Sequence, residues 1–275
     1  MTATLHSIDY LVIAVYLLAL IAIGLSVRGQ KGVKEDLFLG GKNLSWPAIG
    51  FSLFSTNVSP MMLIGFAGLA YSSGIVAANF EWMAWPFLML LAMVFIPHYL
   101  SNNISTMPAF LNVRFGKGSH AFLSYYSLVS ILVIWLGCSL YAGGLIISQV
   151  FAVQLWVAIV VTAVIATSYT ALGGLAAVVR TDVFQSVIII VGSVVLTYMA
   201  FRKIGNIENL VNGVPGDFWT LFKSADSKDY PWYAIVLGYP VIAVFYWCTD
   251  QTIVQKTLAA KNITEGQKAS VFTAF

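Results

Sequence analysis

Apolar runs of about the length that crosses a lipid bilayer fill most of this sequence. A membrane-spanning helix needs about 20 mostly apolar residues, because each residue adds about 1.5 Å along the axis and the hydrocarbon core is about 30 Å thick. Such runs cover residues 8–27, 46–69, 80–100, 121–150, 155–170, 183–201 and 232–248, and a further run starts at Ala269. The sequence therefore predicts an all-α membrane protein.

Charged residues are too scarce for a soluble chain. They make up 9% of the 275 residues, whereas a soluble domain carries about 25%. A soluble enzyme and a soluble nucleic-acid-binding protein are therefore excluded. The sequence also lacks the HExxH, GxSxG and P-loop patterns that supply a metal-bound water, an activated nucleophile or a phosphate-binding loop. We predict that the chain is not an enzyme.

The basic residues are concentrated in alternate connections between the runs. Ten of the 14 follow the first, third, fifth and seventh runs, and the other four lie among acidic residues in 202–230. The ten are Arg28, Lys31, Lys34, Lys42, Arg114, Lys117, Arg180, Lys256, Lys261 and Lys268. Connections rich in Lys and Arg stay in the cytoplasm. This pattern predicts a multi-pass protein of the plasma membrane with its N-terminus on the extracellular or periplasmic side, and the net charge of +3 requires no nucleic-acid partner.

Two runs contain residues that interrupt a helix. Residues 55–60 read Ser-Thr-Asn-Val-Ser-Pro in the second run, and residues 238–240 read Gly-Tyr-Pro in the seventh. Proline lacks an N–H and disfavours helix in the residue before it, and a carbonyl freed in lipid must find another partner. A kink relieved by Ser or Thr hydroxyls is one interpretation. Because the two breaks lie five spans apart, we favour an inverted-repeat transporter with its binding site at the breaks.

Few ionisable side chains lie near these breaks. Glu81 begins the third run, and it is either a solvated helix N-terminus or a carboxylate that faces a water-filled cavity. Asp182, at the start of the sixth run, has the same two interpretations. Asp250 is predicted to be an interfacial charge beside Lys256. The Tyr-Trp pair at 246–247 belongs either to an interfacial aromatic belt or to the cavity.

Several short segments follow one another in a recognisable order over residues 38–261. They are Phe-Leu-Gly-Gly-Lys-Asn-Leu at 38–44, Ser-Thr-Asn-Val-Ser at 55–59, Glu-Trp-Met at 81–83, Tyr-Thr-Ala-Leu-Gly-Gly-Leu-Ala-Ala-Val at 169–178 with Thr-Asp at 181–182, and Tyr-Trp-Cys-Thr-Asp-Gln-Thr-Ile-Val-Gln at 246–255. Together they resemble the sodium/solute symporter family, and specifically its sodium/glucose cotransporter branch.

The resemblance implies a leucine-transporter-type fold, in which two inverted five-helix repeats follow an extra N-terminal helix. Family members have about twice this length, so the chain is expected to hold about half of one transmembrane domain. Residues 8–27 would be the leading helix, residues 46–201 the first repeat, and residues 232–275 the start of the second repeat.

The resemblance also assigns roles to individual positions. Main-chain oxygens of Ser55 and Val58 match positions that hold sodium, and Asp182 matches an aspartate on the sodium exit route. The substrate-binding candidates are Asn57, Glu81, Tyr246, Trp247, Met62 and Ala243. Asn57 and Glu81 match residues that contact sugar hydroxyls, and Tyr246 matches an inner-gate tyrosine that stacks on the sugar. Met62 and Ala243 are apolar where some sugar transporters are polar, which leaves fewer partners for hydroxyl groups.

The function that this resemblance implies is sodium-driven symport of a small polar solute, with a monosaccharide as first choice, by alternating access. Na+, the solute and membrane lipid are the expected partners, and the sequence leaves the oligomeric state open. A proton-coupled carrier that uses Glu81, a channel or solute sensor on the same fold, and a fragment that is inactive alone remain as alternatives.

Overall fold

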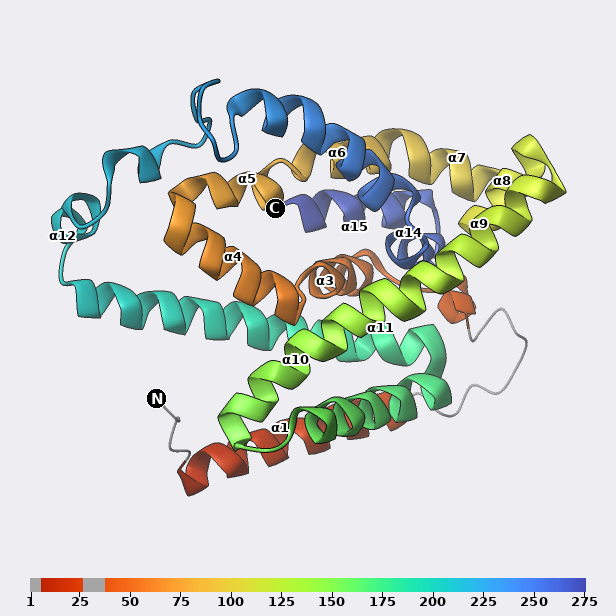
Figure 1. The fold of residues 1–275 in the computed structure, drawn as a ribbon. Helices are drawn as coiled ribbons and strands as arrows, with labels where there is room; N and C mark the ends of the chain where they lie inside the picture. The colour runs from red at the N-terminus through yellow and green to blue at the C-terminus, as the bar shows by residue number, and fades with distance from the viewer. Residues whose placement is uncertain (1–5, 27–37) are drawn as a thin grey trace.

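The computed structural model describes residues 6–26 and 38–275, and all regular elements in these residues are helices (Figure 1). The α-helices are α1 (Ser7–Ser26), α3 (Trp46–Asn57), α4 (Pro60–Ser73), α5 (Asn79–Trp82), α6 (Trp85–Leu90), α7 (Ile96–Ser101), α8 (Met107–Phe115), α9 (Lys117–Val129), α10 (Leu136–Phe151), α11 (Leu155–Ile204), α12 (Ile207–Asn212), α13 (Tyr239–Ala243), α14 (Gln251–Leu258) and α15 (Ile263–Ala274). Wider π turns interrupt some of them, at η3 (Leu91–Phe95), η4 (Ser130–Trp135), η6 (Ala234–Gly238) and η7 (Val244–Thr249). Short 3-10 helices lie at η1 (Gly40–Lys42), η2 (Gly74–Ala78) and η5 (Gly216–Trp219).

The prediction of a multi-pass membrane protein is confirmed, but the predicted span 46–69 does not form one continuous helix. In the described part of the chain, four continuous helical stretches are long and apolar enough to cross a bilayer, namely Ser7–Ser26, Pro60–Ser101, Lys117–Phe151 and Gly173–Ile204. Leu155–Ser168 and Ala234–Thr249 are shorter apolar helices. Only 6% of the most apolar window in Lys117–Phe151 is buried, so this helix presents apolar side chains outward along its length. The protein is a multi-pass membrane protein.

The predicted break in the second run is confirmed. Helix α3 ends at Asn57, Val58 and Ser59 are extended with ψ values of 102° and 159°, and α4 begins at Pro60. Proline fits the first position of a helix because it has no N–H to leave unpaired there. The hydroxyl oxygen of Ser59 accepts a hydrogen bond from the Met62 N–H at 3.2 Å and caps the new helix. The local sequence therefore both ends one helix and starts the next.

The predicted break at Gly238–Pro240 is wrong. Gly238 and Tyr239 keep helical dihedral angles, and the π turn η6, which ends two residues before Pro240, accommodates the proline. The chain leaves the helix at Asp250 instead, where ψ is 132°. The Asp250 carboxylate accepts a hydrogen bond from the Thr252 N–H at 2.9 Å and caps α14. Asp250 is thus the cap at the second interruption, which lies ten residues after the proline.

Helix α11 contains the fifth and sixth predicted spans, which turn back on one another at Gly174. This residue has φ of +60° and ψ of −159°, a conformation that side chains with a Cβ rarely adopt. Figure 1 shows the two halves of α11 running in opposite directions from this point. The glycine therefore replaces a connecting loop.

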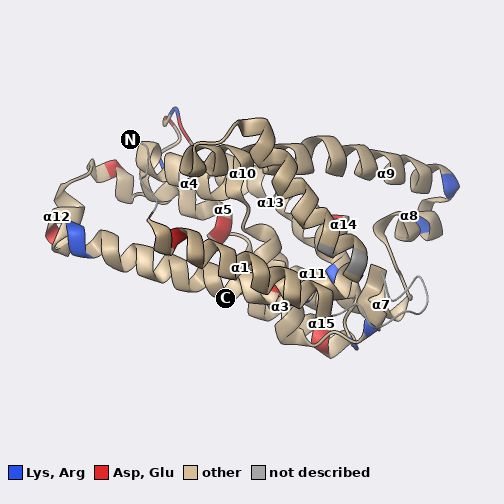
Figure 2. Cartoon of the chain, turned by 90° about the horizontal axis from the view of Figure 1, so that it is seen from below, with Lys and Arg blue, Asp and Glu red and all other residues tan. Residues whose placement is uncertain are grey.

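The connections lie at two opposite ends of the molecule, as the charge pattern predicts. One end holds α8, the turn at Gly174 and the segment between α14 and α15, and the other holds α12, η2 and the link between α10 and α11 (Figure 1). Most charged residues also lie near the two ends (Figure 2). Arg28, Lys31 and Lys34 of the predicted basic set lie outside the described residues. The alternation of connections between the two ends is therefore confirmed.

Helix α3 lies at the centre of the fold and packs against α11, α14 and α15. Its Ile49 and Leu53 side chains are fully buried. Gly50 permits the closest approach, because a Cβ at this position would lie 2.5 Å from Cδ1 of Phe272 on α15. The C-terminal end of α3, where the chain breaks, is therefore held on several sides.

Candidate functional site

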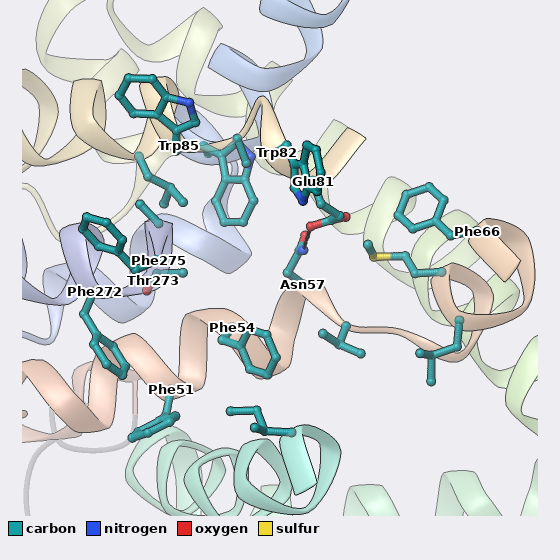
Figure 3. Close-up of a pocket in the computed structure, with 18 of the residues that line it drawn as sticks. Phe51, Phe54, Asn57, Phe66, Glu81, Trp82, Trp85, Phe272, Thr273 and Phe275 are labelled. Carbon is teal, nitrogen blue, oxygen red and sulfur yellow. Dashed lines mark hydrogen bonds between the residues drawn. The ribbon is translucent and has the colours of Figure 1, made fainter. Parts of the chain in front are cut away.

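The break after α3 opens into a cavity of about 1250 Å³. Two polar side chains meet at its wall, where Nδ2 of Asn57 donates a hydrogen bond to Oε2 of Glu81 at 2.7 Å. Figure 3 shows these side chains pointing toward each other from the end of α3 and from α5. Glu81 is half-buried with a specific partner, so its second interpretation, a carboxylate that faces a cavity, is the one that the structure supports.

Helix α5 is short, and a contact to a distant loop fixes its start. Asn79 is buried, and its Nδ2 donates a hydrogen bond to the carbonyl of Leu221 at 2.6 Å. The Tyr239 hydroxyl donates to the carbonyl of Phe80 at 2.8 Å. These two bonds hold the backbone on which Glu81 sits, and they come from residues more than 140 positions away in the sequence.

Eight aromatic side chains form a large part of the remaining wall, beside aliphatic ones. They are Phe51, Phe54, Phe66, Trp82, Trp85, Trp247, Phe272 and Phe275. Many ligand sites combine an apolar lining with a few polar groups that fix orientation. A solute with both hydroxyl groups and C–H faces matches this lining, because hydroxyls can bind Glu81 and Asn57 while C–H groups contact the rings.

The structure brings some of the predicted substrate-binding residues together and not others. Asn57, Met62, Glu81 and Trp247 line the cavity. Tyr246 does not line it; its ring packs edge-on against Trp247, with the ring centroids 5.0 Å apart.

Ala243 does not reach the cavity either. It is 2% exposed and packs in the same apolar cluster as Ala84 and Leu88. The π turn that follows it, η7, sets which residues of this helix face the cavity, and the sequence does not show that turn.

The two predicted sodium ligands lie at the end of α3. The last hydrogen bond of this helix runs from the Val58 N–H to the Phe54 carbonyl at 3.2 Å, so the carbonyls from Ser55 onward lie beyond it. Pro60 has no N–H to donate to the carbonyl of Thr56, four residues earlier. In membrane transporters, unwound carbonyls of this kind coordinate sodium. Val58 also lines the cavity, whereas Ser55 does not.

A buried ion pair is the feature that the sequence interpretation missed. Nζ of Lys256 lies 2.7 Å from Oδ2 of Asp182, and the two residues are 6% and 9% exposed. The interpretation of Lys256 as a positive charge of a cytoplasmic connection is therefore wrong, because α14 carries it into the packed interior. The sequence contains a signal for this pair, because an aspartate at the edge of an apolar run, such as Asp182, is commonly paired with a basic side chain.

The ion pair is joined to α3. The ammonium group of Lys256 donates to the main-chain carbonyl of Ser52 at 3.0 Å and to the hydroxyl of Thr56. The Ser52 hydroxyl donates to Asp182, and the Thr56 hydroxyl donates to the Ser52 carbonyl at 2.8 Å. Asp182 thus lies in a cluster that contacts the last turn of α3, one turn before the break.

Comparisons with known proteins agree with this architecture. Residues 37–274 match the model of the family described as "Sodium:solute symporter family". The chain is 33% identical over 292 residues to sodium/glucose cotransporter 4 of Danio rerio, which covers 99% of this chain and 44% of the relative. It is 35% identical over 285 residues to the sodium/glucose cotransporter of Vibrio parahaemolyticus, covering 98% of this chain and 52% of the relative. The chain spans about half the length of these curated relatives.

A solved structure shares the fold. The structure of a Na+-coupled sialic acid symporter in a substrate-bound outward-open state superposes with a TM-score of 0.88 at 22% identity, over 98% of this chain and 57% of the other. This likeness confirms the predicted leucine-transporter-type fold. The family match over most of the chain and the identity to the cotransporters confirm the resemblance carried by the short sequence segments, and the chain belongs to the sodium:solute symporter family.

Proposed function

We propose that this protein couples the entry of sodium to the uptake of a small polar solute, with a monosaccharide as substrate, and that it is a transporter and not an enzyme. The observation that carries the proposal is the Asn57–Glu81 pair at the helix break, in a cavity lined by aromatic rings. The family match and the names of the similar cotransporters support it.

Each partner has its own part of the site. Main-chain oxygens of Ser55 and Val58 hold sodium, and neutral ligands suit an ion that must also be released. Asn57 and Glu81 bind the hydroxyl groups of the solute. Met62 and Trp247 supply apolar surface beside them.

Two further residues act later in the cycle. Tyr246 acts as inner gate through its contact with Trp247, while Ala243 supports that gate from the core and does not touch the solute. Asp182 receives sodium on its way out.

Transport proceeds by alternating access. Residues 8–27 form the leading helix, residues 46–201 the first repeat and residues 232–275 the start of the second. The protein lies in the plasma membrane with the end that holds α8 in the cytoplasm, so that the N-terminus is outside. One sodium that crosses about 100 mV releases about 2.3 kcal/mol, and a tenfold sodium gradient adds about 1.4 kcal/mol. Together these hold a solute gradient of roughly 500-fold, since about 1.4 kcal/mol corresponds to a factor of ten.

Uptake in proteoliposomes tests the proposal. Radiolabelled monosaccharides are supplied to the purified full-length protein under an inward sodium gradient, and an equal potassium gradient is the control. Accumulation only with sodium supports symport, and equal uptake under both gradients contradicts it. Accumulation driven by a pH gradient without sodium would instead support the proton-coupled carrier, with Glu81 as the titrating group. Binding without accumulation would support a sensor or channel.

A further inference from the structure

The ammonium group of Lys256 lies in a cage made entirely of oxygen atoms. Its partners are a carboxylate oxygen of Asp182, the main-chain carbonyl of Ser52 and the hydroxyl of Thr56. An ammonium group has three N–H donors, and each has a partner here. Carboxylate, carbonyl and hydroxyl oxygens are also the groups that bind hard metal cations. Lys256 thus fills a position whose chemistry would suit a free cation.

This cage lies next to the proposed sodium ligands. Ser52 and Thr56 belong to the last turns of α3, and Ser55 is on the same turn as Thr56. Three helical residues span about 4.5 Å along the axis, so the carbonyls of Ser52 and Ser55 are neighbours on the scale of electrostatic interactions. Two cations this close repel each other, and the repulsion is strong where little water screens it.

The cage also holds three helices together. Lys256 is on α14, which begins at the second interruption of the backbone, and Asp182 is on the second half of α11. Both contact α3 in front of the first interruption. The ion pair therefore joins α14, which follows the second interruption, to the end of α3, which precedes the first interruption.

We propose that Lys256 is a tethered cation that competes with sodium: its ammonium group neutralises Asp182 and the end of α3 when sodium is absent, and so sets the sodium affinity of the neighbouring break. This rests on the proposed sodium-coupled function and deepens it. Asp182 becomes available to a sodium ion only after the ammonium group has moved away. Lys256, which is not a sodium ligand, then keeps the sodium affinity low enough for the ion to be released.

Binding of radiolabelled sodium to the purified full-length protein, without solute, tests this proposal. Lys256→Met removes the competing charge and leaves Asp182 free, and it is expected to lower the half-saturating sodium concentration at least tenfold. Asp182→Asn leaves the lysine without its counter-ion, and it is expected to raise that concentration at least tenfold. The double variant restores a neutral cluster and is expected to bind sodium within about threefold of the unmodified protein. Lys261→Met, which removes an exposed positive charge five residues away, is the matched control and is expected to change nothing.

The direction of the shifts separates competition from a purely structural role. If the ion pair only held the helices together, Lys256→Met and Asp182→Asn would both weaken sodium binding, and that result overturns the proposal. An unchanged affinity in Lys256→Met overturns it as well. If Lys256→Met does not fold, the double variant still separates the two roles: competition predicts a sodium affinity within about threefold of the unmodified protein, and a purely structural role predicts weaker sodium binding.

If the proposed symport function is wrong, the experiments give a different set of results from those that overturn the role of Lys256. An unmodified protein that binds sodium but accumulates solute without a sodium gradient contradicts symport, and the Lys256 shifts can still appear. If neither the unmodified protein nor Lys256→Met binds sodium, both proposals are wrong.

Discussion

Removing the carboxylate of Glu81 is expected to weaken binding of the solute by about tenfold to hundredfold. In the structure one of its oxygens, Oε2, accepts a hydrogen bond from Asn57 at 2.7 Å, and Glu81 lines the cavity. A hydrogen bond to a charged group contributes about 1.5 to 3 kcal/mol, and about 1.4 kcal/mol corresponds to a factor of ten. Glu81→Ala should therefore lose about one to two powers of ten in affinity. Glu81→Gln, which keeps the shape and loses the charge, should lose less.

Equilibrium binding of a labelled monosaccharide at saturating sodium measures this effect. The half-saturating sodium concentration, measured without solute, should change little, because the proposed sodium ligands are main-chain oxygens. Glu208→Ala is the matched control, since Glu208 is an exposed acid on α12, away from the cavity. An unchanged solute affinity in Glu81→Ala would refute the reasoning and make Glu81 a helix-end charge. An equal loss in Glu208→Ala would show that the effect is not specific to the cavity.

Three further predictions address the fold, the break and the orientation. Gly174→Ala forces a Cβ into a backbone with φ of +60° and should lower the free energy of unfolding by about 1 kcal/mol or more, whereas Gly192→Ala, in open space, should not; thermal unfolding compares the two. Pro60→Ala supplies an N–H at the break and should favour continuous helix there, so half-saturating sodium should rise in the radiolabelled binding assay, and unchanged binding would count against carbonyls at the break as ligands. Single cysteines at Lys117 and at Glu208 should react with a membrane-impermeant thiol reagent from opposite sides, with Glu208 labelled from outside; labelling of both from one side would contradict the proposed topology.

Much of the fold could be predicted because its signals are local. Long apolar runs indicate membrane-spanning helices, since the hydrocarbon core of a bilayer is about 30 Å thick. Pro60 ends a helix through atoms within four residues of itself, and the sequence therefore located the first break correctly. The short segments that resemble the family predicted the leucine-transporter-type fold, and the fold comparison confirms this prediction.

The second break could not be located in the same way. Pro240 could equally break the helix or be absorbed by a π turn, and the structure shows the π turn with the interruption at Asp250. Asp250 can cap α14 only because α14 has a place to pack among α3, α7 and α15. A proline signals a missing donor, but the surrounding helices decide where the chain bends.

The sequence by itself determined that this chain crosses a membrane several times, where the second apolar run breaks and which family the chain belongs to, because these follow from run length, proline chemistry and short motifs. Only the tertiary structure decided which side chains meet. Asp182 and Lys256 are 74 residues apart, and Asn57 and Glu81 lie on different helices. Their contacts depend on how α3, α5, α11 and α14 pack, and charges in an apolar interior are stable only where packing gives each one a partner.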